Sequence, residues 1–110
     1  MRRPHSYTTY TRAAITLLGS LVAQARRERG WTLAELASRC QTSVSTMRKV
    51  ERGQPDVAIG IAFEAAAILQ IPLFDPDPAH LAALGRQADD RLRLLPQRIR
   101  VKEDPVDDNF

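Results

Sequence analysis

The segment over residues 32–53 constrains the fold of this chain more than any other part of the sequence. It reads Thr-Leu-Ala-Glu-Leu-Ala-Ser-Arg-Cys-Gln-Thr-Ser-Val-Ser-Thr-Met-Arg-Lys-Val-Glu-Arg-Gly, the pattern of two short helices joined by a tight turn. Thr32 and Glu35 form a capping box, in which each side chain can accept a hydrogen bond from the backbone N–H of the other residue. We therefore expect the first of these helices to begin after Thr32 and to end at Cys40.

The turn and the second helix follow directly. Gln41 and Thr42 are the turn residues, Ser43 is a suitable N-cap, and Gly53 stops the helix. Many turns of this kind contain glycine because the backbone is left-handed there. We expect either that Gln41 takes that conformation at a modest cost or that the turn differs slightly from the usual one. Two short helices joined in this way are a helix-turn-helix, a motif that places its second helix in the major groove of DNA.

The charge of the chain is divided unevenly between its halves. The net charge is +3, but residues 1–53 carry ten Lys/Arg against three Asp/Glu, whereas residues 54–110 carry six against ten. The first half is therefore +7 and the second −4. A basic helix face that is merely solvated would give the same imbalance. Its coincidence with the helix-turn-helix favours instead a surface that faces phosphates.

Apolar residues at helical spacing predict three further helices, over about 11–29, 57–69 and 77–95. The chain is thus expected to be all-α, with five helices including the two of the motif. The boundary residues are Gly30, which ends the first; Asp56, the expected N-cap of the second; and Asp77 and Pro78, which begin the third.

The last of these helices carries a narrow apolar stripe that resembles a coiled-coil seam, formed by Leu81, Leu84, Ala88, Leu92 and Leu95. The stripe has two interpretations, a seam for a second copy of the chain or packing onto the four preceding helices. We favour dimerisation, because one recognition helix reads only a few base pairs and a two-fold dimer doubles the contact. The candidate interface residues are Leu81, Leu84, Leu92 and Leu95.

Exposed residues near the start of the second motif helix are the candidates for reading bases, since this end enters the groove. Lys49 can donate to guanine O6 and N7, and Val44 can touch a thymine methyl group. Ser45 lies four residues before Lys49 on the same face, and Thr46, like Ser45, can bond bases or phosphates. A solvated surface helix would also be polar here. The paired helices, the caps and the basic half favour a base-reading surface.

A second set of residues is expected to contact DNA phosphates. The backbone N–H groups of Thr32 and Leu33 lie at a helix N-terminus, where they can bind a phosphate. Arg48 lies further round the second motif helix than Lys49, so a phosphate is its expected partner. The remaining candidates are the side chains of Arg39, Arg52, Arg2 and Arg3.

The sequence gives little support for other chemistry. Metal binding needs three or four converging donors, whereas His5 and His80 stand far apart. Cys40 has no basic partner nearby and there is no Gly-rich phosphate loop, so we expect no enzyme and no metal or cofactor site. No stretch approaches the roughly 20 apolar residues of a membrane span. The single cysteine and the lack of a secretory signal favour a cytoplasmic protein.

Two strings within residues 17–71 carry a resemblance to a known family. Thr-Leu-Ala-Glu-Leu-Ala and Ser-Thr-Met-Arg-Lys-Val-Glu-Arg-Gly are similar to the two motif helices of the Xre or Cro/C1-type helix-turn-helix family. That resemblance implies a five-helix, lambda-repressor-like DNA-binding fold. In the family an Arg near the end of the first helix pairs with the Glu before the final Xaa-Gly, which implies a structural ion pair between Arg26 and Glu51.

The same resemblance bears on the DNA contacts. Base contacts in the family fall at positions that match Val44, Ser45, Thr46 and Lys49 of this chain. The sequence departs from the family at Leu33, where many members have a phosphate-binding Gln, and at Gln41 in the turn. The departure at Leu33 bears on one phosphate contact and leaves the expected fold unchanged.

Three further strings extend a narrower resemblance over nearly the whole chain. They are the start Arg-Pro-His-Ser-Tyr, the Pro-Leu-Phe after the fourth helix, and the end Leu-Leu-Pro-Gln-Arg-Ile-Arg-Val-Lys…Val-Asp-Asp-Asn-Phe. They resemble HipB-type antitoxins, which bind DNA, pair with HipA-like kinase toxins and repress their shared operon. The expected partners are thus a palindromic DNA operator, a second copy of the chain and a HipA-like kinase toxin.

The segment over 96–110 has a basic run followed by an acidic one and contains little to bury, so we expect a flexible tail. Its plain interpretation is a frayed, solvated end. The second interpretation is a segment that becomes ordered when it binds the toxin. The family resemblance makes the two interpretations about equally favoured. Phe110 would then be an aromatic anchor, and Asp107 and Asp108 would meet basic groups.

The sequence as a whole predicts a dimeric, sequence-specific repressor that serves as the antitoxin of a HipBA-like system and regulates its own operon. The alternative is a stand-alone or phage-type regulator without a toxin partner. An interaction module whose motif no longer binds DNA is disfavoured by the intact basic half. The expected organisation is an N-terminal arm over 1–10, a DNA-binding domain over 11–71, a helix for dimerisation over 77–95 and a tail over 96–110.

Overall fold

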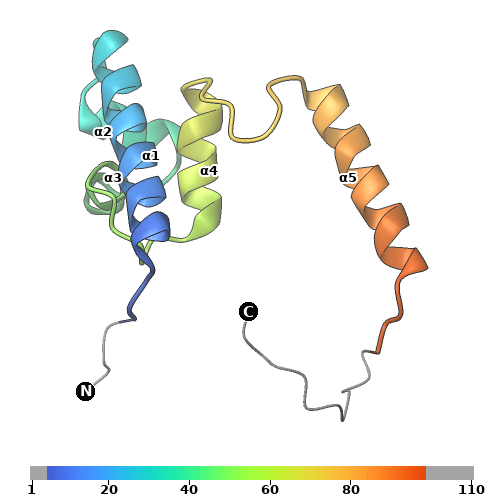
Figure 1. Cartoon of the computed structure of the whole chain (residues 1–110). Helices are drawn as coiled ribbons and strands as arrows, with labels where there is room; N and C mark the ends of the chain where they lie inside the picture. Colours follow the sequence, from blue (N-terminus) through green and yellow to red (C-terminus); the bar gives the residue numbers. More distant parts are fainter. Residues whose placement is uncertain (1–4, 99–110) are drawn as a thin grey trace. The chain divides into compact units, whose positions relative to one another are not determined.

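The computed structural model describes residues 5–98, a range that contains five helices and no strand (Figure 1). The chain divides into two compact units between Pro76 and Asp77. The all-α fold expected from the sequence is thus confirmed in the described part of the chain. The first unit contains α1 (Thr9–Glu28), α2 (Leu33–Arg39), α3 (Val44–Glu51) and α4 (Ile59–Ile68), and the second contains α5 (Pro78–Leu94).

The core of the first unit joins its four helices. Val22 of α1, Leu36 of α2 and Met47 of α3 are its largest fully buried side chains. Full burial of a side chain of this kind contributes roughly 1.5–3 kcal/mol. The two helices of the motif are therefore held against α1 by apolar packing. The other buried members of the cluster are Ala37, Cys40, Val50, Ala65 and Leu69.

Close backbone contact between α1 and the end of α3 depends on two glycines. A Cβ atom on Gly19 would lie 2.5 Å from the backbone oxygen of Val50 and 2.8 Å from that of Glu51. Gly53 has a φ of +70°, and a Cβ there would lie 2.9 Å from the Cα of Thr16. No other residue type fits either position without moving the backbone, so the two helices approach as closely as they do because both residues are glycine.

The turn between α2 and α3 takes the first of the two forms expected from the sequence. Gln41 has a φ of 56°, in the left-handed region. Its N–H donates to the carbonyl of Ser38, and the N–H of Thr42 donates to the carbonyl of Ala37, both at 3.0 Å. A non-glycine residue in this region costs roughly 1–2 kcal/mol, which these bonds and the buried neighbours Ala37 and Cys40 offset.

Two helix starts differ from the sequence-based expectation. The first helix begins at Thr9 rather than near Thr11, because the hydroxyl of Thr8 accepts a hydrogen bond from the backbone N–H of Thr11 at 3.3 Å. The helix expected over 57–69 begins at Ile59, and its N-cap Ala58 makes no side-chain cap. Asp56 is therefore not the N-cap. An Asp before an apolar run is compatible with an N-cap, but in the structure the N-cap is Ala58, two residues after Asp56.

The second unit begins as expected from the sequence. Asp77 is the N-cap of α5, its Oδ1 accepts a hydrogen bond from the backbone N–H of Ala79 at 3.1 Å, and Pro78 is the first residue of the helix. No residue of α5 is buried. The four leucines of the stripe, Leu81, Leu84, Leu92 and Leu95, are between 40% and 65% exposed.

Candidate nucleic-acid interface

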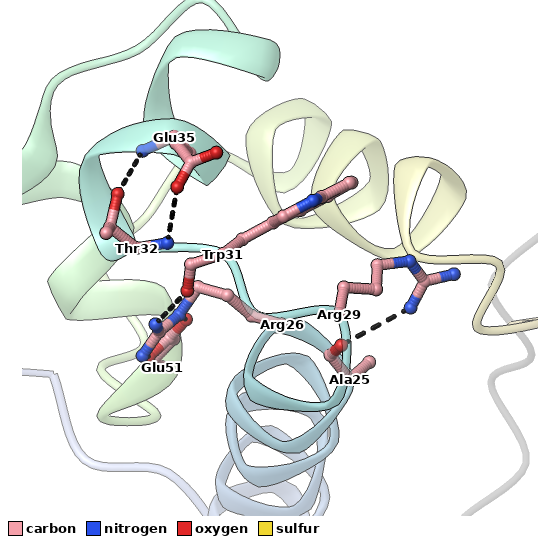
Figure 2. Close-up of polar contacts among 7 residues, drawn as sticks. All are labelled: Ala25, Arg26, Arg29, Trp31, Thr32, Glu35 and Glu51. Carbon is pink, nitrogen blue, oxygen red and sulfur yellow. Dashed lines mark hydrogen bonds and ion pairs between the residues drawn. The ribbon is translucent and has the colours of Figure 1, made fainter.

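The frame of the site is a partly buried arginine, Arg26, that joins three parts of the chain. Arg26, near the end of α1, donates from Nε and Nη2 to the two carboxylate oxygens of Glu51 at 2.6 and 3.0 Å (Figure 2). Its Nη1 donates to the backbone oxygen of Trp31 at 2.8 Å. The side chains of Arg26 and Glu51 are only 12% and 11% exposed. The ion pair implied by the family resemblance is therefore present, with the carbonyl of Trp31 as an additional acceptor.

The local electrostatics favour this arrangement. The hydrogen bonds from Arg26 to Glu51 raise the pKa of the Arg26 guanidinium, partial burial opposes them, and the charge of Glu51 adds to the rise. A bidentate Arg–carboxylate pair also fixes the relative orientation of its two helices. Because Glu51 is the last residue of α3, and Trp31 precedes the N-cap of α2, the arginine sets where both motif helices lie relative to α1.

The start of α3 is fixed by its cap. The Oγ of Ser43 accepts a hydrogen bond from the backbone N–H of Thr46 at 3.0 Å, and the Ser43 hydroxyl donates to the Oγ1 of Thr46 at 3.0 Å. Thr46 therefore takes part in the cap. It is also partly buried, whereas Val44 and Ser45 are exposed. Of the four base-reading candidates, Val44 and Ser45 are presented most openly.

Lys49, the fourth candidate, already has a partner. Its Nζ lies 3.5 Å from the Oδ2 of Asp56 in the loop after α3. The two side chains are 45% and 66% exposed, so water screens the pair and its net stability is small. Asp56 therefore pairs with Lys49 rather than capping α4, and no pattern in the sequence indicated this pairing.

The N-terminus of α2 is less open to a phosphate than the sequence suggested. The backbone N–H of Thr32 donates to Oε1 of Glu35 at 3.0 Å, and that of Glu35 donates to Oγ1 of Thr32 at 3.0 Å (Figure 2). The hydrogen bond from Thr32 lowers the pKa of the Glu35 carboxyl, so an anionic group occupies this helix end at neutral pH. A phosphate contact through the N–H of Thr32 would require Glu35 to release it. The N–H of Leu33 lies outside the capping box.

The arginine candidates for phosphate contacts differ in their surroundings. The guanidinium carbon of Arg39 lies 4.0 Å from the ring centroid of Trp31, a cation–π contact that orients the group and leaves its edge able to donate. Arg48 and Arg52 are exposed, and neither forms an ion pair with another residue in the described range. Arg2 and Arg3 lie outside the described residues, as do the candidate partner-binding residues Asp107, Asp108 and Phe110.

The geometry of residues 32–53, two capped helices around a left-handed turn on a buried frame, agrees with a comparison against known families. The profile of the helix-turn-helix domain matches residues 17–71, half of the chain. The chain belongs to the helix-turn-helix family. The Xre or Cro/C1-type assignment made from the sequence is thereby confirmed at the level of the superfamily. No curated protein matches the chain.

The hydrogen bonds made by Arg29 were not predicted from the sequence. Arg29, one residue after α1, donates from Nη2 to the backbone oxygen of Leu69 at 3.1 Å, and from Nη1 to that of Ala25 at 3.4 Å. Its guanidinium carbon also lies 5.6 Å from the Trp31 ring centroid. The available signal was the position of an arginine just before Gly30, because such a side chain can reach carbonyls at a helix end.

The lone cysteine, metal ligation and membrane crossing are three further features of the described residues. Burial raises the pKa of the Cys40 thiol, and the nearby charge of Glu64 adds to the rise, so the reactive thiolate is disfavoured. Among residues 5–98, no group of three or more His, Cys, Asp or Glu is placed to hold a metal ion. Nor does any helix in that part of the chain have the length and apolar character needed to cross a membrane.

Proposed function

We propose that this helix-turn-helix protein is a sequence-specific transcriptional repressor that reads DNA through α3. The observation that carries the proposal is the outward face of α3, where Val44 and Ser45 are exposed while Met47 and Val50 are buried beneath them. The ion pair between Arg26 and Glu51 fixes the angle of that face. A rigid helix that presents small and cationic side chains is what direct readout in the major groove requires.

The division of labour follows from side-chain chemistry. Lys49 would donate to guanine O6 and N7 after leaving Asp56, and Val44 would contact a thymine methyl group. Ser45 would bond a base edge, with Thr46 supporting the start of the helix as well as lying near the bases. Arg39, Arg48 and Arg52, together with the N–H of Leu33, would meet phosphates and set the register without reading sequence.

Repression of a specific site also calls for a dimer. One recognition helix covers only a few base pairs, and a two-fold dimer doubles both the contact and the length of the site. The proposed interface is formed by the exposed leucines Leu81, Leu84 and Leu92 of α5 and by Leu95 just after it, because solvent exposure of this much apolar surface is unfavourable. The operator is then a palindrome with two half-sites.

The narrower part of the proposal is that the repressor is an antitoxin. Its support is the HipB-type resemblance of the two chain ends and of the Pro-Leu-Phe string over 72–74. In this proposal the protein regulates its own operon, and the tail with Asp107, Asp108 and Phe110 binds a kinase-like toxin. A stand-alone regulator of the same helix-turn-helix class is the second candidate, since the family match covers only residues 17–71.

DNA selection tests the repressor. Purified full-length chain is incubated with a random duplex library, bound duplexes are amplified, and the enriched motif is compared with the region upstream of its own gene. An enriched palindrome that footprinting also locates upstream is the expected result. A library without any enriched motif would show that α3 does not read sequence.

Affinity purification tests the antitoxin. Tagged full-length chain and a copy lacking residues 97–110 are recovered from the native cells, and co-purifying proteins are identified. A kinase-like protein retained by the full chain and lost with the truncation is the expected result. If both the full chain and the truncated copy retain the kinase-like protein, the antitoxin proposal stands but the contact lies outside residues 97–110. Recovery of no protein partner leaves the stand-alone regulator.

A further inference from the structure

The first unit has a pocket that the proposed DNA contacts do not explain. It has a volume of about 590 Å³ and lies between the segment before α1, the first turns of α1 and the loop after α3. That volume is within the range of roughly 300–1,000 Å³ typical of small-molecule sites. The lining residues are His5, Ser6, Tyr7, Arg12, Ile15, Thr16, Arg52, Gly53 and Pro55.

The lining is cationic. It includes Arg12 and Arg52 and no Asp or Glu. Neither arginine forms an ion pair or side-chain hydrogen bond with another residue of the described range. The first turn of α1 has no acidic residue either, so the positive end of that helix dipole is not compensated. Two arginines without an ion-pair partner among the described residues at one pocket favour an anionic ligand, and a phosphate is an anion that guanidinium groups bind well.

The pocket depends on the same close contact that positions α3. Because Gly53 has no Cβ, its backbone lies against that of Thr16, and this contact brings Arg52 to the side of α1 that carries Arg12. The two arginines are 40 positions apart in the sequence, so only the folded domain forms the site.

The remaining lining indicates what else the ligand carries. The rings of His5 and Tyr7 lie 4.4 Å apart between centroids and form an aromatic wall, and Ile15 and Pro55 add apolar surface. Hydroxyl groups come from Ser6, Tyr7 and Thr16. A phosphate of the DNA backbone would not contact the aromatic rings or fill this volume. A phosphorylated small molecule with a planar part would do both.

We propose that this pocket binds a small phosphorylated ligand of about the size of a nucleoside monophosphate. Arg12 and Arg52 hold the phosphate, and the wall formed by His5 and Tyr7 packs against the planar part. The inference does not rest on sequence-specific DNA reading. If Arg52 also serves DNA, ligand and DNA compete for one guanidinium, and the ligand weakens DNA binding.

The test is isothermal titration of the full chain, at constant ionic strength, with adenosine monophosphate, inorganic phosphate and adenosine as probes. We expect millimolar or tighter binding of adenosine monophosphate, weaker binding of phosphate, and the weakest of adenosine. Amide shifts in NMR spectra should fall on Arg12, Thr16 and Gly53. Absence of binding by both phosphate probes, or shifts confined to other residues, would overturn the proposal.

Matched variants distinguish binding in the pocket from attraction of the ligand by the net positive charge. Arg12→Gln and Arg52→Gln should each weaken adenosine monophosphate about tenfold, the usual effect of losing a charge-assisted hydrogen bond. Arg27→Gln makes the same change on α1 outside the pocket and should leave the affinity within about twofold. Tyr7→Phe, which removes only a hydroxyl, serves as a mild second variant. An equal loss in Arg27→Gln would mean that the ligand responds only to net charge.

A final arm separates a free ligand from the DNA backbone. A short duplex of arbitrary sequence is added to the complex with each probe. The proposal expects adenosine monophosphate to bind more tightly than phosphate whether or not the duplex displaces it. If the two probes bind equally and the duplex displaces both, the pocket is a contact for backbone phosphates and the small-molecule proposal is wrong. That outcome leaves the repressor itself untouched.

Discussion

At the scale of single residues, Arg26 and Glu51 stabilise the domain and are not themselves proposed to contact DNA. Both side chains are nearly buried, and together they make three hydrogen bonds with each other and with Trp31. Removing one partner from such a pair leaves the other charge without compensation. The pair therefore belongs to the stability of the domain, and any effect on DNA binding comes through the position of α3.

Glu51→Gln tests this assignment. We expect the free energy of unfolding in urea to fall by roughly 1–3 kcal/mol, the cost of disrupting hydrogen bonds to a charged group. Glu28→Gln, at the exposed last residue of α1, is the control and should change stability by less than about 0.5 kcal/mol. Equal stabilities for the two variants would contradict the structural role.

Lys49 and Asp56 differ from that buried pair, because they form a solvent-exposed ion pair on the proposed DNA-reading surface. Lys49→Ala should weaken binding to the selected duplex by about 1–3 kcal/mol without changing the melting temperature. Asp56→Asn removes a negative charge beside the DNA and releases the ammonium, so binding to duplex of arbitrary sequence should strengthen by up to about fivefold. Fluorescence anisotropy measures both. Unchanged affinity for the selected duplex in Lys49→Ala would remove this residue from the readout.

Glu35 makes the stability of the domain depend on pH. Its folded-state pKa is lowered by the hydrogen bond from Thr32, so the charged form is favoured by folding. The contribution is present above the unfolded pKa, about 4.3, and is lost as pH falls through the lower folded value. Melting curves from about pH 6 to about pH 3 should therefore fall less steeply for Glu35→Gln than for the natural chain. Parallel curves would show that the capping carboxylate carries no charge preference.

At the scale of helices, glycine decides how α1 meets α3. Gly19→Ala would place a methyl group 2.5 Å from the backbone oxygen of Val50, so the helices must separate. We expect a loss of roughly 1–3 kcal/mol in unfolding free energy. Gly60→Ala in α4 is the matched control, because it has open space and should be neutral or stabilising by up to about 1 kcal/mol. A stable Gly19→Ala protein would mean that the contact can be opened at little cost.

Helix pattern and capping residues predicted the elements well, because those signals are local. Thr32, Ser43 and Asp77 each cap the helix that the sequence assigned to them. Asp56 failed as a cap because an Asp before an apolar run fits a loop as well as an N-cap, and only the fold showed Lys49 beside it. The close contact through Gly19 gave no local signal, since a glycine within a helix looks the same whether or not a backbone lies against it.

At the scale of the whole molecule, the open question for the proposed repressor is how two copies join. Leu84 and Leu92 lie within the α5 stripe, and Leu94 lies on the same helix outside it. If the stripe is the interface, the double variant Leu84→Glu with Leu92→Glu is monomeric by sedimentation. Leu94→Glu, a surface change of the same kind, should remain dimeric.

The same variants test the electrostatics. A dimer with about 6–10 phosphate contacts loses roughly 10³–10⁵ of affinity between 50 and 200 mM salt, and a monomer should show about half the logarithmic slope. Anisotropy titrations over that range supply the slope for each variant. A double variant that stays dimeric, or keeps the full slope, places the interface elsewhere.

The whole-molecule features were the hardest to foresee from the sequence. Residues 17–71 announce a DNA-binding fold because the motif is compact and local. The pocket formed by Arg12 and Arg52 requires the folded domain, since its walls come from three separate segments. The residues of the chain ends whose roles the sequence suggested, such as Phe110, lie outside the described range.

The buried frame described for Arg26 has a consequence for how such a protein changes over generations. The residues that hold α3 in place are Arg26, Glu51, Ser43 and the buried Met47, whereas Val44 and Ser45 contribute almost nothing to that hold. Exposed positions accept substitution at little cost in stability. If α3 reads DNA as proposed, successive replacements at Val44 and Ser45 change the preferred DNA site while the scaffold stays the same.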